Sequence, residues 1–100
     1  MTRRNKSQII FDILELLRKN KADEIETRPT HIMYGANLSF IMSNNYLTFL
    51  QGSDLINKIQ KKSDNDIEYT VYEISEKGYN FLKKVKPAFK EMEELLSKFK

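Results

Sequence analysis

Residues 29–53 contain no lysine, arginine, aspartate or glutamate, although these four residue types make up 31% of the 100-residue chain. A short helix is predicted over residues 30–34, a tight turn over 35–38 and a second helix over 39–53. The turn contains a glycine and an asparagine, which adopt turn conformations at little steric cost. Ser39 is a good N-cap, because its hydroxyl can accept a hydrogen bond from a free backbone N–H. The stretch therefore predicts a helix-turn-helix, around which the rest of the chain is organised.

The second helix of this pair has two chemically different faces. An apolar stripe at helical spacing, which we expect to be buried, consists of Met42, Tyr46, Leu47 and Leu50. The opposite stripe, rich in amide groups, consists of Ile41, Asn44, Asn45, Thr48 and Gln51. This pattern predicts a helix that packs on its own domain and presents hydrogen-bonding groups to solvent.

The remaining segments predict a third helix, a β-hairpin and a long last helix. A helix is expected over residues 7–20, with Ser7 as its N-cap and an apolar stripe at helical spacing. Strands over 55–62 and 67–74 are rich in β-branched and aromatic residues and enclose a polar turn cluster. The helix over 75–100 begins at a serine N-cap. The fold class expected from these elements is α+β, mainly α.

The last helix carries an apolar heptad stripe, whose positions are Leu82, Val85, Phe89, Met92, Leu96 and Phe99. A helix of about 25 residues is about 37 Å long, more than a small domain can cover. We therefore divide the chain into a domain over residues 1–75 and a helix over 76–100 that forms a homodimeric coiled coil. The alternative is that its apolar end folds back on its own domain. Pro87 is expected to kink or break this helix at a cost of roughly 3 kcal/mol.

Two runs of sequence resemble a known family. The run HIMYGANLS, residues 31–39, is similar to the helix-turn-helix core of an archaeal winged-helix family that includes small dimeric chromatin-associated DNA-binding proteins. The run YEISEKG, residues 72–78, is similar to the end of the wing in that family. The similarity covers most of residues 7–85. It implies a winged helix-turn-helix with a long C-terminal dimerisation helix, an antiparallel pairing of those helices, and double-stranded DNA as the partner.

DNA binding of this kind would place the second helix in the major groove. Asn44 and Asn45 would then pair with adenine edges, and the flanking cations would neutralise phosphates. The full predicted DNA-binding set is Arg3, Arg4, Lys6, Arg28, His31, Ser39, Ser43, Asn44, Asn45, Thr48, Lys58, Lys61 and Lys62. An ordinary surface role is the alternative for Arg28, for His31 and for the basic N-terminus. The helix cannot make the common contact of arginine with guanine, so we expect weak, salt-sensitive binding with poor sequence specificity.

Composition narrows the function classes further. The net charge of +3 and the sequence pI near 9.1 are compatible with a polyanionic partner. The chain has no cysteine and one histidine, and no nucleophile with a nearby base or phosphate-cradling loop is recognisable. We expect no enzyme activity, no cofactor, no metal, no small-molecule substrate and no membrane partner, in a cytoplasmic, nucleoid-associated protein. The alternative function is a protein–protein interaction module, which the neutral face with Phe40 and Ile41 would suit.

Overall fold

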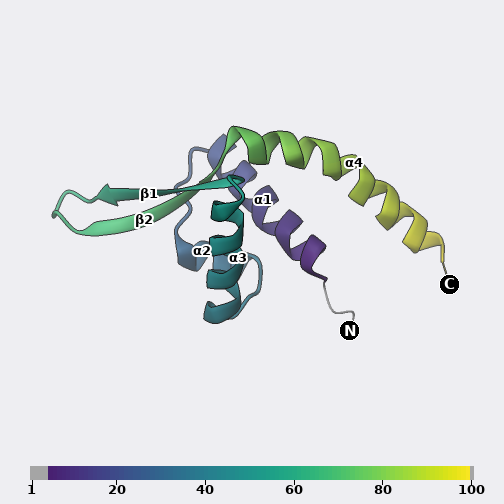
Figure 1. Cartoon of the computed structure of the whole chain (residues 1–100), viewed down its shortest axis with the longest axis horizontal. Coiled ribbons are helices and arrows are strands. Elements are labelled where there is room, and N and C mark those ends of the chain that lie inside the picture. Colours follow the sequence, from purple (N-terminus) through teal and green to yellow (C-terminus); the bar gives the residue numbers. More distant parts are fainter. Residues whose placement is uncertain (1–4, 100) are drawn as a thin grey trace.

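The computed structural model describes residues 5–99 of the chain. In chain order its elements are α1 (Lys6–Ala22), α2 (Pro29–Gly35), α3 (Phe40–Gly52), β1 (Ile56–Lys62), β2 (Glu68–Ile74) and α4 (Glu76–Lys98). Figure 1 shows the two strands as a hairpin on one side of the helices, with the far end of α4 on the other side. The predicted winged helix-turn-helix is confirmed, and each element ends within two residues of its expected bounds.

Local hydrogen bonds explain where the helices begin. The side chains of Asn5, Ser39 and Ser75 each accept a hydrogen bond from the backbone N–H three residues later, at 2.8, 3.2 and 2.9 Å. The predicted caps at Ser39 and Ser75 are thus confirmed, whereas the cap predicted at Ser7 is wrong because α1 begins earlier. In the turn between α2 and α3, Asn37 adopts the left-handed conformation with φ of 54°.

The core lies between α1, α3, the base of the hairpin and the start of α4. Its most deeply buried side chains are Ile13, Leu14, Leu17, Ile32, Leu50, Ile56, Val71 and Leu82. In α3 the expected buried stripe is right for three residues and wrong for Met42, which is 43% exposed, while Ser43 is 4% exposed. At about 100° per residue, Ser43 falls between Leu50 and Leu47 on the helix surface and so lies within the buried stripe, whereas Met42 falls outside its edge.

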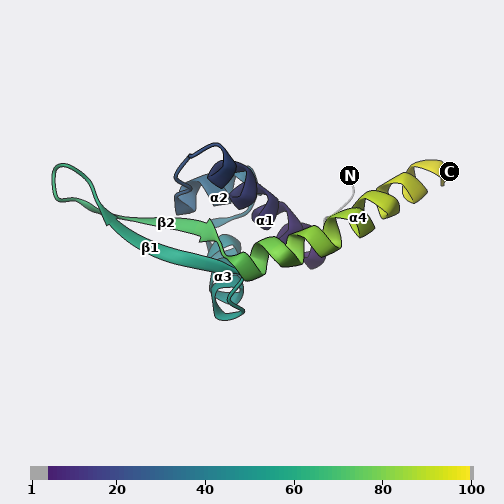
Figure 2. The same cartoon turned by 90° about the horizontal axis from the view of Figure 1, so that it is seen from above.

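The wing is an antiparallel pair in which Ile56 lies opposite Ile74 and Lys62 lies opposite Glu68. Thr27 adds a single bridge on the other side of β2, where the N–H of Tyr72 donates to the carbonyl of Thr27 at 2.9 Å. The wing is therefore tied to the segment that leads into α2. Seen from above, it extends well beyond the helices (Figure 2).

The first half of α4 belongs to the domain itself. Leu82 is 1% exposed, Val85 packs against the core, and the ring centroid of Phe89 lies 4.6 Å from that of Phe11. Leu82 in particular is unavailable to a second chain. The first three positions of the predicted dimer stripe thus contact this chain's own domain, because a heptad stripe buries equally well against its own α1.

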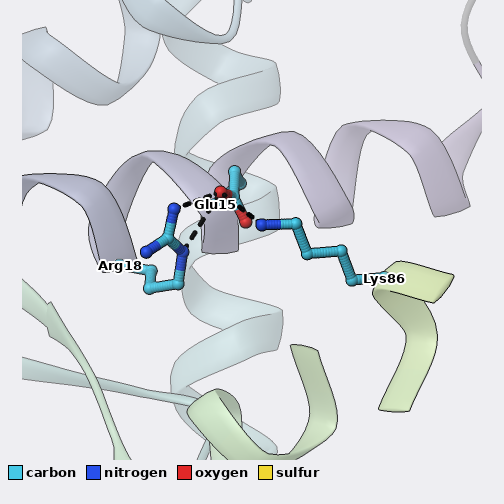
Figure 3. A network of polar contacts seen from close by, with 3 residues as sticks. All are labelled: Glu15, Arg18 and Lys86. Atoms are coloured by element: carbon cyan, nitrogen blue, oxygen red, sulfur yellow. Dashed lines mark hydrogen bonds and ion pairs between the residues drawn. The ribbon is translucent and has the colours of Figure 1, made fainter. Parts of the chain in front are cut away.

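A polar cluster also fixes α4 to α1 (Figure 3). Arg18 donates to one carboxylate oxygen of Glu15 at 2.5 and 3.1 Å, and Lys86 of α4 approaches the same oxygen at 3.4 Å. The hydrogen bond from Arg18 lowers the pKa of Glu15, against the opposing effect of burial. The carboxylate therefore links two helices that are far apart in sequence.

Beyond this anchored part, α4 continues past Pro87 to Lys98 without a break and curves along its length (Figure 1). Its last turns leave the domain, in a molecule that measures 55 × 28 × 25 Å. Met92, Leu96 and Phe99, the last three positions of the predicted stripe, are exposed there together with Leu95. Among residues 5–99, no helix is both long and apolar enough to cross a membrane.

Candidate nucleic-acid interface

The outward surface of α3 is neutral and exposed. Tyr46, Leu47 and Leu50 hold one side of the helix in the core. The opposite side exposes Phe40, Ile41, Asn44, Asn45, Thr48 and Gln51. These six residues are called the α3 face below. All of them except Phe40 form the outward stripe predicted from sequence. The structure therefore brings the predicted base-contacting residues Asn44, Asn45 and Thr48 onto one surface.

Ser43, by contrast, does not reach this surface. It is buried beside Leu47 on the inner side of α3, so its predicted contact with a phosphate is wrong. Ser39 is exposed, but its hydroxyl already accepts the capping hydrogen bond from Met42 N–H. Ser39 therefore caps α3, and Ser43 packs on its inner side.

A lysine flanks the α3 face on the side of α1. Lys6 lies at the start of α1 and lines a shallow hollow between α1 and α3, together with Ile10, Met42, Asn45 and Phe49. Arg3 and Arg4, which were predicted to contact phosphates with Lys6, fall outside the described residues. The N-terminal end of α1 thus brings positive charge next to Asn45.

A second lysine flanks the α3 face on the side of the wing. Lys58 of β1 lines a hollow that also includes Thr70 of β2 and both Phe40 and Asn44 of α3. Figure 1 shows α3 at the lower edge of the molecule, between the wing and the N-terminal end of α1. The neutral α3 face therefore lies between two cationic flanks.

The three lysines of β1 do not act as one group. Side chains alternate along a strand, so Lys58 and Lys62 share one face of the wing and Lys61 lies on the other. Lys61 donates to Glu26 at 2.6 Å, and the hydroxyl of Tyr69 donates to the second oxygen of Glu26 at 3.0 Å. Within residues 5–99, neither Lys58 nor Lys62 forms an ion pair.

Glu26 offsets the positive charge on the face of the wing that carries Lys61. The hydrogen bond from Lys61, and then that from Tyr69, lowers the pKa of the Glu26 carboxyl. The same contact raises the pKa of Lys61, and the hydrogen bond to Glu26 raises the pKa of Tyr69. Lys61 therefore differs from the two free lysines, since a carboxylate offsets its charge.

Arg28 and His31 lie at the start of α2, next to the wing. The guanidinium carbon of Arg28 lies 4.4 Å from the ring centroid of Tyr69, within the range of a cation–π contact. The backbone N–H of Arg28 donates to Nδ1 of His31 at 3.3 Å, which satisfies one of the free N–H groups at the helix start. Both side chains remain exposed.

Sequence reasoning did not predict the roles of Glu26 and Tyr69. In the sequence, Glu26 is one of several acidic residues between the first two helices, and Tyr69 is one of several aromatic and β-branched residues in a strand. The alternation of β1 would have separated Lys61 from its neighbours, and the strand register would have placed Tyr69 opposite Lys61. The approach of Glu26 depends on how the 23–28 connection folds, for which the sequence carries no comparable pattern.

Comparisons with known proteins agree with this architecture. A family model described as winged helix-turn-helix matches residues 3–94. An uncharacterized protein of Methanocaldococcus jannaschii is 36% identical over 88 residues; the match covers 88% of this chain and 35% of that protein. The chain thus spans about a third of the length of that curated relative.

Two solved structures are informative in different ways. Sso10a-2, described as a DNA-binding protein from Sulfolobus solfataricus, superposes with a TM-score of 0.68 at 29% identity, over 94% of this chain and 87% of that one. A PadR-like transcriptional regulator from Bacillus cereus superposes with a TM-score of 0.77 over 92% of this chain and 90% of that one. Its identity of 18% shows a shared fold alone. By sequence and by fold, the chain belongs to the winged helix-turn-helix family.

Proposed function

We propose that this protein binds double-stranded DNA by inserting α3 into the major groove. The observation that carries the proposal is the position of the neutral α3 face between two cations, Lys6 on one side and Lys58 on the other. Neither lysine forms an ion pair with another of the residues 5–99. A major groove about 12 Å wide admits a helix, while phosphates line both of its edges. The description of the similar Sso10a-2 as a DNA-binding protein supports the same reading.

In this mode, phosphate contacts position the protein and base contacts give it what specificity it has. Lys6, Arg28, Lys58 and Lys62 contact phosphates, as do Arg3 and Arg4. Asn44 and Asn45 hydrogen-bond adenine edges, with Thr48 beside them. His31 and Ser39 stand at the rim of the surface. The protein acts as a transcriptional regulator or a chromatin-associated protein in the cytoplasm, on the nucleoid, and not as an enzyme.

We further propose that two chains pair through the free end of α4. Met92, Leu95, Leu96 and Phe99 are exposed there at helical spacing, and burying such a stripe against a second copy is favourable. The seam is shorter than the heptad pattern predicts, because Leu82 lies in the core of its own domain. A homodimer would present two α3 faces to one duplex and gain affinity from their linkage.

The second candidate is a protein–protein interaction module. The specific observation in its favour is the exposure of Phe40 and Ile41, since large apolar side chains at the centre of a surface are typical of protein interfaces. The free lysines at both edges of the same surface favour a polyanion instead. Two measurements distinguish the candidates. One is binding of the purified protein to a mixed-sequence duplex at low salt, and the other is a pull-down of protein partners from a nuclease-treated lysate.

The test of DNA binding uses fluorescence anisotropy with a labelled mixed-sequence duplex and the Lys58→Ala, Lys62→Ala double variant. Each phosphate contact that is removed reduces the slope of log K against log salt by about 0.9. We expect weaker binding and a slope reduced by about 1.8 in the double variant. The matched control, Lys84→Ala, removes an exposed lysine of α4 away from the α3 face and leaves the slope unchanged. An equal loss in the control and in the double variant would contradict the proposal.

A further inference from the structure

Two large apolar side chains occupy the first turn of α3. Phe40 is 75% exposed and Ile41 is 70% exposed, at the position where the reading helix of a helix-turn-helix meets base edges. Neither is needed for the core, which α3 joins through its opposite side. These exposed side chains would therefore be buried favourably against an apolar group in the major groove of DNA.

The major groove offers one apolar group. Thymine presents its C5-methyl there, whereas guanine presents two acceptors that arginine or lysine reads. Residues 40–52 contain no arginine or lysine, so α3 lacks the side chains that select guanine. It has Asn44 and Asn45 instead, and asparagine pairs with the N6 and N7 groups of adenine. The available side chains match both partners of an A·T pair.

The spacing of these groups fits base pairs about two steps apart. Phe40 and Asn44 are four residues apart on one side of α3, which separates them by about 6 Å along the helix. Successive base pairs are about 3.4 Å apart, so the two side chains span about two steps of the duplex. Both also line the hollow that contains Lys58, which places a phosphate-binding cation at the same edge.

Building on the proposed DNA binding, we propose that α3 selects A·T base pairs through the thymine methyl group. Phe40 and Ile41 contact the C5-methyl of thymine, and Asn44 or Asn45 hydrogen-bonds the adenine edge. The cations on both flanks identify DNA as the occupant of this apolar surface, because a neutral protein partner would leave Lys6 and Lys58 unpaired at its rim. The preference comes from contact with methyl groups and needs no charged residue on α3.

The test compares duplexes of equal length that differ in major-groove methyl groups. One contains A·T pairs, a second replaces every thymine with deoxyuridine, which removes only the methyl, and a third contains G·C pairs. We expect the deoxyuridine duplex to bind about fourfold more weakly for each buried methyl group. A fourth duplex, with 5-methylcytosine in the G·C sequence, returns a methyl to the groove and recovers part of the affinity. The salt slope stays the same for all four, since their phosphates are identical.

Variants assign the effect to residues. Phe40→Ala and Ile41→Ala each reduce the ratio of thymine to deoxyuridine affinity, while binding to the deoxyuridine duplex and its salt slope change little. Both residues are exposed, so the variants retain the fold. Ile25→Ala, at an exposed apolar position in the connection before α2, is the control and leaves the ratio unchanged.

The two proposals fail in different ways. Salt-dependent binding with equal affinity for the thymine and deoxyuridine duplexes overturns the methyl readout and leaves DNA binding intact. A thymine preference that persists in both alanine variants overturns the assignment to Phe40 and Ile41. No binding to any of the four duplexes at low salt overturns DNA binding itself, and the methyl readout with it.

Discussion

Replacing Leu82 with alanine tests which partner the first half of α4 packs against. The side chain is 1% exposed within a single chain and belongs to the core formed by α1, α3 and the base of the wing. Leu→Ala at an enclosed site costs about 2–5 kcal/mol, because it removes apolar contacts and leaves a cavity. At about 4–8 °C for each kcal/mol in a domain of this size, a loss of about 3 kcal/mol lowers the Tm by about 12–24 °C.

Leu96→Ala is the matched substitution on the same helix. Leu96 is 59% exposed in the single chain, so its truncation removes few contacts within the domain. If two chains pair through the end of α4, this variant lowers stability only at protein concentrations where the wild type is dimeric. Leu82→Ala lowers the stability of the monomer and the dimer alike.

Urea unfolding followed by circular dichroism, at two widely separated protein concentrations, measures both effects. Sedimentation equilibrium gives the oligomeric state under the same conditions. The reasoning is refuted if Leu82→Ala costs less than about 1 kcal/mol, or if its cost appears only at high protein concentration. A small cost would mean that Leu82 is not enclosed by its own domain. A cost that appears only at high protein concentration would mean that a second chain completes the α4 stripe at Leu82.

Three further predictions concern the close packing and the carboxylates of the domain. Gly78→Ala destabilises the protein by about 3 kcal/mol or more in urea unfolding, because a Cβ at this position would lie far inside van der Waals contact of the Leu55 carbonyl oxygen; wild-type stability would contradict that contact. Glu26→Gln leaves Lys61 uncompensated, but Lys61 lies on the other face of the wing from Lys58 and Lys62, so the DNA affinity and the salt slope in the anisotropy assay change little; a steeper slope would show that Lys61 contacts the DNA. The pKa values of Glu15 and Glu26 are lowered by folding, so their contribution to stability is present above about pH 4.5 and is lost as the pH falls through their folded values. Glu15→Gln should therefore flatten the acid limb of a stability–pH profile, and an unaltered limb would count against the contact with Arg18.

The sequence predicted the elements well where local chemistry decides them. Ser39 and Ser75 cap their helices because a hydroxyl at that position satisfies a backbone N–H regardless of the surroundings. The wing follows from β-branched and aromatic strands around a polar turn. Such signals are contained in a few neighbouring residues.

Features that depend on contacts between distant segments could not be predicted in the same way. Phe89 packs on Phe11 of its own chain, an outcome that a heptad pattern does not distinguish from pairing with a second chain. The partner of Lys61 comes from a connection whose path is set by the bridge between Thr27 and Tyr72. In each case the pattern identified an apolar or charged group correctly but not the group that meets it.

The salt dependence of binding to a mixed-sequence duplex tests the central claim most directly. Lys6 and Lys58 flank the neutral α3 face, and together with Arg28 and Lys62 they make four proposed phosphate contacts. Each neutralised phosphate contributes about −0.9 to the slope of log K against log salt, which gives about −3.6 for one chain. We expect measurable binding at low salt and a linear decline of log K with log salt, with a slope at least this steep. An affinity independent of salt, or no binding at low salt, would contradict the account.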